Sequence, residues 1–243
     1  GMFHPDAAVN RHDAVAWGYA RKADSYGVEV HQKTAVQSLM RDARGNICGV
    51  ETNRGTVRAK KVAVVVSGHT TTLTDTVDLK LPLRTFNLTA FVSEPVKPFI
   101  DVVVNCPDIG VYFSQSDKGE LVIGGAPDAG QSFRRDIKQH VFEDSVCALL
   151  ELFPSFKKLK MLRQWGGHLD ISHDATPILD QTDIPGLFVS AGWWGGYKAI
   201  PAGGYTLAHL LATGQRHDLA EPFGIERFKN LQFVSESGTT TAR

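Results

Sequence analysis

The fold of this chain is decided by the stretch Leu187-Phe188-Val189-Ser190-Ala191-Gly192-Trp193-Trp194-Gly195-Gly196-Tyr197-Lys198-Ala199-Ile200-Pro201-Ala202-Gly203-Gly204-Tyr205. An apolar run breaks into a glycine-rich loop that carries aromatic residues and a lysine, and residues 205–213 have the apolar spacing of a helix. The pattern predicts a strand, a loop large enough to approach a flat ligand, and a helix whose N–H groups point into that loop. A helix terminus of this kind favours an anionic or electron-rich partner, although the glycines alone fit a packed connection equally well.

Composition narrows the class of protein. With 243 residues, 42% of them hydrophobic and 21% charged, the chain can bury one large core or two modest ones. Its 26 basic and 26 acidic residues give no net field, which argues against nucleic-acid binding and favours a small molecule or a protein as partner. No apolar run is long enough to span a membrane, and Cys48, Cys106 and Cys147 show no disulfide or zinc-site spacing, so we expect a cytoplasmic protein.

The first third of the chain is predicted to enter a meander of strands from a helix. Apolar spacing indicates a helix over residues 13–26, with Asn10 or Asp13 as N-cap and Gly27 as its stop. Strands are predicted at residues 28–31, 34–40, 47–52 and 62–66, with turns at 42–46 and 54–55. The last of these strands is apolar without alternation, which is typical of a strand buried on both faces of a mainly parallel sheet.

The middle of the chain has a different pattern, in which apolar and polar residues alternate. Alternating strands are predicted at residues 89–93, 110–114 and 120–123, with a hairpin turn at 117–119, and they indicate an antiparallel sheet. A helix over residues 141–152 and a strand over 162–170 follow before the glycine loop. No GxGxxG turn follows any strand near the N-terminus, so the chain is expected to begin partway through a dinucleotide-binding fold.

Several motifs in this order resemble one family. They are residues 11–17 (RHDAVAW), 68–69 (GH), 118–122 (KGELV), 165–167 (WGG), 174–178 (DATPI) and 203–209 (GGYTLAH). Together they resemble the β subunit of heterotetrameric sarcosine oxidase, a member of the D-amino-acid-oxidase-like flavoprotein superfamily. The likeness runs from about residue 12 to residue 228, and its collinearity makes it more specific than any single motif.

The resemblance implies oxidation of sarcosine or a related N-methyl amino acid at a noncovalent FAD, with electrons passing to FMN and then to O2. In the family the FMN is attached to the first histidine of a His-Asp-His motif; His12 takes that position here, and Ala14 replaces the second histidine. From its residue type alone, His12 is more typical of a surface or capping residue. The family also implies partner subunits, and self-association is the other way to cover an incomplete sheet.

Lys198 matches the family lysine that contacts the substrate carboxylate, and an ammonium in a glycine loop suits a small amino acid. Tyr112, on a predicted strand, either lines the substrate cavity or simply packs. The resemblance places further residues at the flavins, although His69 is equally a backbone-satisfied histidine and Val36 a core valine. The expected flavin contacts besides His12 are Val36, Gly68, His69, Gly195, Gly196, Tyr197, Gly203 and Gly204.

The fold class expected is therefore α/β (α+β): the C-terminal part of a FAD-binding Rossmann-like domain plus an antiparallel substrate domain. We expect residues 2–80 and 166–230 in the first, residues 81–165 in the second, and a flexible tail over 231–243. His168, His173 and Asp174 lack metal-ligand spacing, so no metal is assigned. Two alternatives stay open, a single-flavin amino acid oxidase or dehydrogenase and a flavin-free remnant that serves assembly.

Overall fold

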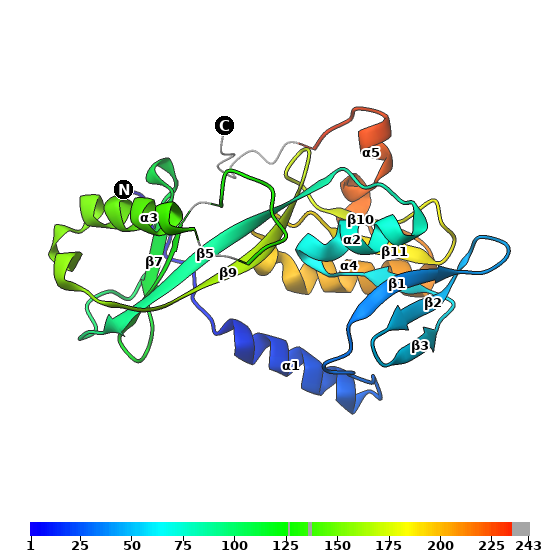
Figure 1. The fold of residues 1–243 in the computed structure, drawn as a ribbon, viewed down its shortest axis with the longest axis horizontal. Helices are drawn as coiled ribbons and strands as arrows, with labels where there is room; N and C mark the ends of the chain where they lie inside the picture. The colour runs from blue at the N-terminus through cyan, green and yellow to red at the C-terminus, as the bar shows by residue number, and fades with distance from the viewer. Residues whose placement is uncertain (126, 136–137, 235–243) are drawn as a thin grey trace.

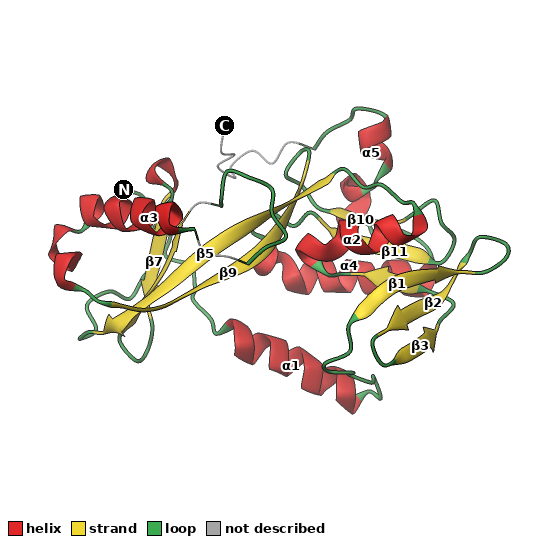
Figure 2. Cartoon of the chain, viewed as in Figure 1, coloured by secondary structure: helices red, strands yellow, loops and turns green. Residues whose placement is uncertain are grey.

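The computed structural model describes residues 1–125, 127–135 and 138–234. The strands form three sheets, and helices pack against them in an α/β arrangement. The largest sheet is long and antiparallel and extends away from the two smaller sheets (Figures 1 and 2). The strands are β1 (Val36–Arg41), β2 (Ile47–Thr52), β3 (Gly55–Arg58), β4 (Val62–Val64), β5 (Leu83–Pro95), β6 (Val104–Cys106), β7 (Val111–Gln115), β8 (Glu120–Gly125), β9 (Met161–Ser172), β10 (Ile178–Gln181) and β11 (Leu187–Ala191). The α-helices are α1 (His12–Ser25), α2 (Thr70–Thr74), α3 (Gln139–Leu152), α4 (Ile200–Thr213) and α5 (Glu226–Lys229), with short 3-10 turns between them.

The largest sheet has the order β6-β7-β8-β5-β9 and is antiparallel throughout, as predicted. In β5 every second residue from Thr85 to Ser93 is buried, the period expected when one face of a strand packs on a core. Helix α3 lies against this face, where Phe91, Phe113 and Leu149 belong to one apolar cluster. Burying each such side chain contributes about 1.5 to 3 kcal/mol of transfer free energy, so this cluster fixes the sheet to α3.

The smaller sheet β10-β11-β4 carries the strand that opened the sequence analysis. All five residues of β11 are buried, with Leu187 and Val189 in one apolar cluster and Phe188 in another beneath α4, so both faces of the strand are covered. Strand β4 pairs with β11 in parallel. The expectation of a fully buried strand over residues 62–66 is wrong at its end, because β4 stops at Val64 while Val65 and Val66 are 55% and 40% exposed.

Strands β1, β2 and β3 form a meander, in which β1 and β2 were predicted and β3 was not. The turn over residues 42–46 is held by Asp42 Oδ1, which accepts hydrogen bonds from the backbone N–H groups of Arg44 and Asn46. The strand expected over residues 28–31 does not form. Val28 and Val30 are more than half exposed, and among the described residues this segment pairs with no other strand. The N–H of Val28 donates instead to the carbonyl of Ala23 at the end of α1.

Helix α1 runs along one side of the molecule (Figure 1) and buries none of its residues. The helix was predicted, but its capping was not. Arg11 is the N-cap without a side-chain bond, Asp13 bonds locally to the N–H of Ala14, and Asn10 accepts a hydrogen bond from Tyr197 instead. Gly27 ends the helix with φ of 81°, as expected.

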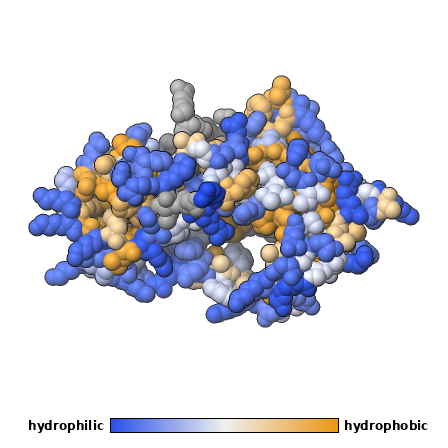
Figure 3. All heavy atoms as spheres, in the orientation of Figure 1, coloured by the Kyte–Doolittle hydropathy of each residue, from blue (hydrophilic) through white to orange (hydrophobic). Residues whose placement is uncertain are grey.

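The domain division at residues 80 and 165 stays a prediction. Of the expected tail, residues 235–243 lie outside the described part, and Val234 is held by a hydrogen bond from its N–H to Asp174 Oδ2. Among the described residues no helix is both long and apolar enough to cross a bilayer. Figure 3, in the orientation of Figure 1, shows polar side chains over much of the visible face, with apolar ones reaching the surface beside α3.

Candidate functional site

Two loops follow the parallel strands β4 and β11 where both strands end. The register pairs Val62 with Leu187 and Val64 with Val189, so the loop over residues 65–69 and the glycine loop over residues 192–199 leave the same edge of the sheet. Crevices outside the carboxyl ends of parallel strands are the usual ligand sites of open α/β sheets. This edge is therefore the candidate functional site.

Asp170 on β9 joins the two loops. Asp170 is only 3% exposed, and its Oδ2 accepts a hydrogen bond from the N–H of Gly192 at 2.7 Å. Its Oδ1 accepts from the Ser67 hydroxyl at 3.2 Å, and Ser67 has a left-handed φ of 47° that a non-glycine residue adopts only at a cost. One buried carboxylate thus holds both loops against the end of the antiparallel sheet.

The glycines that follow β11 have two separate functions in the structure. A Cβ on Gly196 or Gly203 would lie 2.5 or 2.7 Å from the side chain of Trp193, so these two residues make room for that ring. The Trp193 indole N–H donates to Ser190 Oγ at 2.8 Å, which fixes the ring. Gly195, at φ of 59°, has no atom within 4 Å of the position a Cβ would take and faces open space.

Helix α4 begins earlier than predicted. It starts at Ile200 with Pro201 in its first turn, and a 3-10 turn over Gly196–Ala199 precedes it, so Gly203 and Gly204 lie inside the helix and do not open it. The expectation that the helix starts at those glycines is wrong. Glycine is typical of loops, but Gly203 lies in the helix because its missing side chain makes room for the Trp193 ring. The positive end of the helix dipole therefore lies immediately after Lys198.

Lys198 and Tyr197 project from the same 3-10 turn. Within the described part of the chain Lys198 has no ion-pair partner, and it lines a cavity of about 140 Å³ together with Trp194 and Pro177. The Tyr197 hydroxyl donates to Asn10 Oδ1 at 2.6 Å. This bond ties the glycine loop to the segment just before His12, the exposed first residue of α1.

Gly68 and His69 are brought against the end of the antiparallel sheet. A Cβ on Gly68 would lie 2.6 Å from the Cβ of His168 and 2.7 Å from Thr85 Cγ2, so only glycine fits there. The ring of His69 meets that of His168 edge to face, with centroids 4.9 Å apart. Desolvation, followed by the electrostatic effect of His168 and Arg135, lowers the pKa of His69 below its ordinary 6.5, so the structure favours the neutral imidazole.

Sequence reasoning missed His168 as part of this environment. Both of its ring nitrogens are buried and have no hydrogen-bond partner among the described residues. A buried polar group without a partner is uncommon and marks a position for a ligand or an ordered water. No local signal reveals it, because Gly68 and Thr85, which enclose it, lie far away along the chain.

Tyr112 and Val36 lie elsewhere. Tyr112, on β7, covers Gly124 of the neighbouring strand so closely that a Cβ there would be 2.1 Å from its ring, and burial raises the pKa of its phenol. Val36 begins β1 and is 39% exposed, so the alternative of a core valine is wrong. Among the described residues no group of three or more histidine, cysteine, aspartate or glutamate side chains is arranged to hold a metal ion.

Comparison with known proteins identifies the class of protein that this fold and site define. Residues 1–210 match the family of FAD dependent oxidoreductases, so the chain belongs to that family of flavoproteins. The chain is 47% identical over 228 residues to sarcosine oxidase subunit beta of Rhodobacter capsulatus, and 41% identical over 239 residues to the subunit of the same name in Rhizobium meliloti. These alignments cover 93% and 98% of the chain but only 55% and 57% of the relatives, so the chain spans little more than half of their length.

Solved structures agree on the fold. L-proline dehydrogenase from P. horikoshii superposes with a TM-score of 0.83 at 22% identity, covering 90% of this chain and 60% of that one. Glycine oxidase from Geobacillus kaustophilus gives 0.74 at 24% identity, covering 88% and 57%. The predicted fold class and the predicted family are both confirmed.

The residues present fit a flavin ring. Gly195 leaves open space beside the backbone, and α4 directs its N-terminus at the same loop. Lys198 offers an ammonium that has no ion-pair partner within the described part of the chain. A flat, electron-rich ring that gains negative charge on reduction needs close backbone approach and a positive field, and this loop supplies both. The GxGxxG turn that holds a dinucleotide pyrophosphate does not occur in this sequence.

Proposed function

We propose that this chain forms the flavin-facing and substrate-facing part of an enzyme that oxidises sarcosine or a related secondary amino acid. The observation that carries the proposal is the position of Lys198, a cation with no ion-pair partner among the described residues, on a glycine loop between the end of β11 and the start of α4. Bound FAD would accept a hydride from the substrate, and the positioning and electrostatics come from the chain. The 47% identity to a sarcosine oxidase subunit supports the substrate class.

Lys198 would bind the substrate carboxylate. A charged donor neutralises that carboxylate and leaves the amine free to bind deprotonated, so no side-chain base is required. Tyr112, 37% exposed on the antiparallel sheet, would line the substrate side. Gly195, Gly196 and Tyr197 would lie against the ring, and the N-terminus of α4 would favour the negative charge that develops on it. Gly68, His69 and Val36 are the remaining proposed contacts.

His12 is the proposed attachment point for FMN, through which electrons would pass to O2. It is exposed at the start of α1, and the bond from Tyr197 to Asn10 holds the preceding segment beside the glycine loop. The unburied surface of α1 suits burial against other subunits of an oxidase assembly. A reducing cytoplasm fits the three free cysteines.

One observation favours a second function. Ala14 replaces the second histidine of the attachment motif, which weakens the case for a covalent flavin and supports a single-flavin oxidase or dehydrogenase. The same experiment separates the two. Acid precipitation of the yellow protein, coexpressed with its partner subunits, should leave flavin in the pellet for the wild type and not for His12→Ala. Flavin found wholly in the supernatant favours the single-flavin enzyme.

The enzyme itself is tested by flavin uptake. A colourless protein that takes up neither FAD nor FMN under those coexpression conditions would contradict both functions and leave the flavin-free assembly module. Sarcosine-dependent bleaching of the flavin absorbance under anaerobic conditions is the result we expect. A flavoprotein that is reduced by other amino acids but not by sarcosine or another secondary amine would overturn the substrate class alone.

A further inference from the structure

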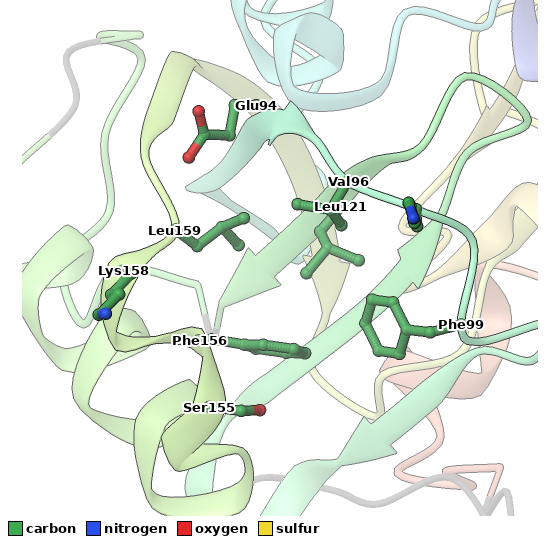
Figure 4. Close-up of a pocket in the computed structure, with 9 residues that line it drawn as sticks. Glu94, Val96, Phe99, Leu121, Ser155, Phe156, Lys158 and Leu159 are labelled. Atoms are coloured by element: carbon green, nitrogen blue, oxygen red, sulfur yellow. The ribbon is translucent and has the colours of Figure 1, made fainter.

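The structure contains a second cavity far from the glycine loop. It lies where β5 ends, between the loop over residues 96–100 and the 3-10 turn Pro154–Lys158 that follows α3, and its volume is about 510 Å³ (Figure 4). Leu83, at the other end of β5, lies beside Gly192, and Glu94 lines this cavity. Eleven residues of extended strand separate the two sites by roughly 36 Å. The cavity is therefore distinct from the candidate flavin site.

The base of the cavity is apolar and aromatic. Phe156 points into it from one side and Phe99 from the other, and their rings meet edge to face with centroids 5.6 Å apart (Figure 4). Phe156 also stacks on Phe153 at 5.2 Å, and Leu121 beneath is fully buried. Phe99 is 53% exposed, so burying it under a ligand would recover apolar surface that now faces water.

The wall that carries Phe99 is already fixed. Gln115 Oε1 accepts hydrogen bonds from the N–H of Phe99 at 2.9 Å and of Ile100 at 3.4 Å. Its Nε2 donates to the carbonyl of Gly119 at 2.9 Å and to those of Val96 and Lys97 at 3.3 Å. A single amide therefore holds the loop over the cavity, and a ligand would not have to order it.

The charges that line the cavity select the ligand. Lys97 and Lys158 both line it, and within the described part of the chain neither ammonium has an ion-pair partner. Glu94 also lines the cavity, and its Oε1 already accepts a hydrogen bond from the N–H of Lys160. Two ammonium groups and one carboxylate leave a single positive charge, which matches a monoanion better than a phosphate dianion.

We propose that this cavity binds a small amphipathic carboxylate with an aromatic or branched apolar body. The apolar body would cover Phe99 and Phe156, and the carboxylate would pair with Lys97 or Lys158. Volumes above about 300 Å³ are typical of small-molecule sites. The site uses no residue of the proposed flavin chemistry, so it stands or falls independently of the proposed function.

Isothermal titration calorimetry with 3-phenylpropanoate tests the site. We expect one saturable site per chain, with binding at least tenfold weaker for propanoate, which lacks the apolar body, and for 2-phenylethylamine, which lacks the carboxylate. The double variant Lys97→Met/Lys158→Met should weaken 3-phenylpropanoate binding at least tenfold. Lys157→Met is the matched control, because Lys157 lies on the same 3-10 turn but does not line the cavity, and it should bind as the wild type does.

Phe99→Ala provides a variant that leaves the buried core intact, because Phe99 is exposed, and it too should weaken binding at least tenfold. Absence of saturable binding to a protein whose circular dichroism is native would overturn the proposal. So would equal binding of 2-phenylethylamine, or an equal loss in Lys157→Met. A dimer that excludes 3-phenylpropanoate and dissociates on Phe99→Ala would replace the small ligand by a second copy of the chain.

Discussion

The N–H of Gly192 donates a hydrogen bond of 2.7 Å to the buried carboxylate of Asp170, and this contact joins the loop of the small sheet to the antiparallel sheet. The same carboxylate accepts from Ser67. Asp170→Ala removes both acceptors and leaves a buried donor unpaired, which costs about 1 to 3 kcal/mol for each such group. We therefore expect the free energy of unfolding in urea to fall by about 2 to 4 kcal/mol. Asp108→Asn, on an exposed turn, should change it by less than about 0.5 kcal/mol.

The two adjacent glycines of α4 give opposite predictions. A Cβ on Gly203 would lie 2.7 Å from the Trp193 ring, whereas one on Gly204 meets nothing within 4 Å. Gly203→Ala should destabilise the protein by about 1 to 3 kcal/mol and move the Trp193 ring, because the added methyl group would overpack the core around that ring. Gly204→Ala should stabilise by about 0.5 to 1 kcal/mol, because alanine is the better helix former. Thermal unfolding measures the change in stability, and tryptophan fluorescence measures the movement of the ring. Equal melting temperatures for the two variants would contradict the conclusion that Gly203 makes room for the Trp193 ring.

The sequence was sufficient to predict the elements whose signal is local. The alternation in β5 and β8 and the continuous apolar run of β11 follow from which faces of those strands are covered. The structure has a strand at each of these places, although β5 extends well beyond the predicted residues 89–93. Residues 28–31 alternate equally well and form no strand, because strand formation needs a partner that the local sequence does not specify.

The candidate site was predicted only in part for the same reason. The glycine loop and Lys198 stand in one continuous stretch of sequence, and Lys198 lies on the 3-10 turn between β11 and α4. Asp170 and His168 were not singled out as members of the site, because they reach it from β9 across the sheet, and nothing near them in sequence records what they face. Gly203 and Gly204 were interpreted as loop residues since glycine signals a turn and a tightly packed helix alike.

The Asp174–Arg227 pair predicts a dependence of stability on pH. The guanidinium Nε donates to Asp174 Oδ2 at 2.8 Å and Nη2 to Oδ1 at 3.0 Å, and both side chains are almost completely buried. Burial alone would raise the pKa of Asp174, but the hydrogen bonds from Arg227 and Ser172 hold it at about 2, below its ordinary 3.8. The folded state therefore favours the ionised form, and the stabilisation is present in full above about pH 4 and is lost as the pH falls towards 2.

Asp174→Asn isolates this contribution. The wild type should exceed the variant in free energy of unfolding by about 2 kcal/mol or more at pH 6, and the difference should shrink as the pH is lowered from about 4 to 2. Urea unfolding at a series of pH values measures it. A difference that stays constant down to pH 2 would show that the pair does not titrate as the geometry requires.

Lys198→Ala tests the proposed substrate anchor in the enzyme assembled with its flavins and subunits. Lys198 is exposed in this structure, and bound flavin and substrate would bury it. Loss of one partner of a buried charge pair costs about 2 to 5 kcal/mol, so binding of sarcosine should weaken at least about thirtyfold, while the visible flavin spectrum changes little. Anaerobic titration with sarcosine, monitored by flavin absorbance, gives both quantities. Lys60→Ala, an exposed lysine outside the glycine loop, should bind as the wild type does. An unchanged affinity in Lys198→Ala would remove the lysine from the substrate site, and the carboxylate would then need another cation.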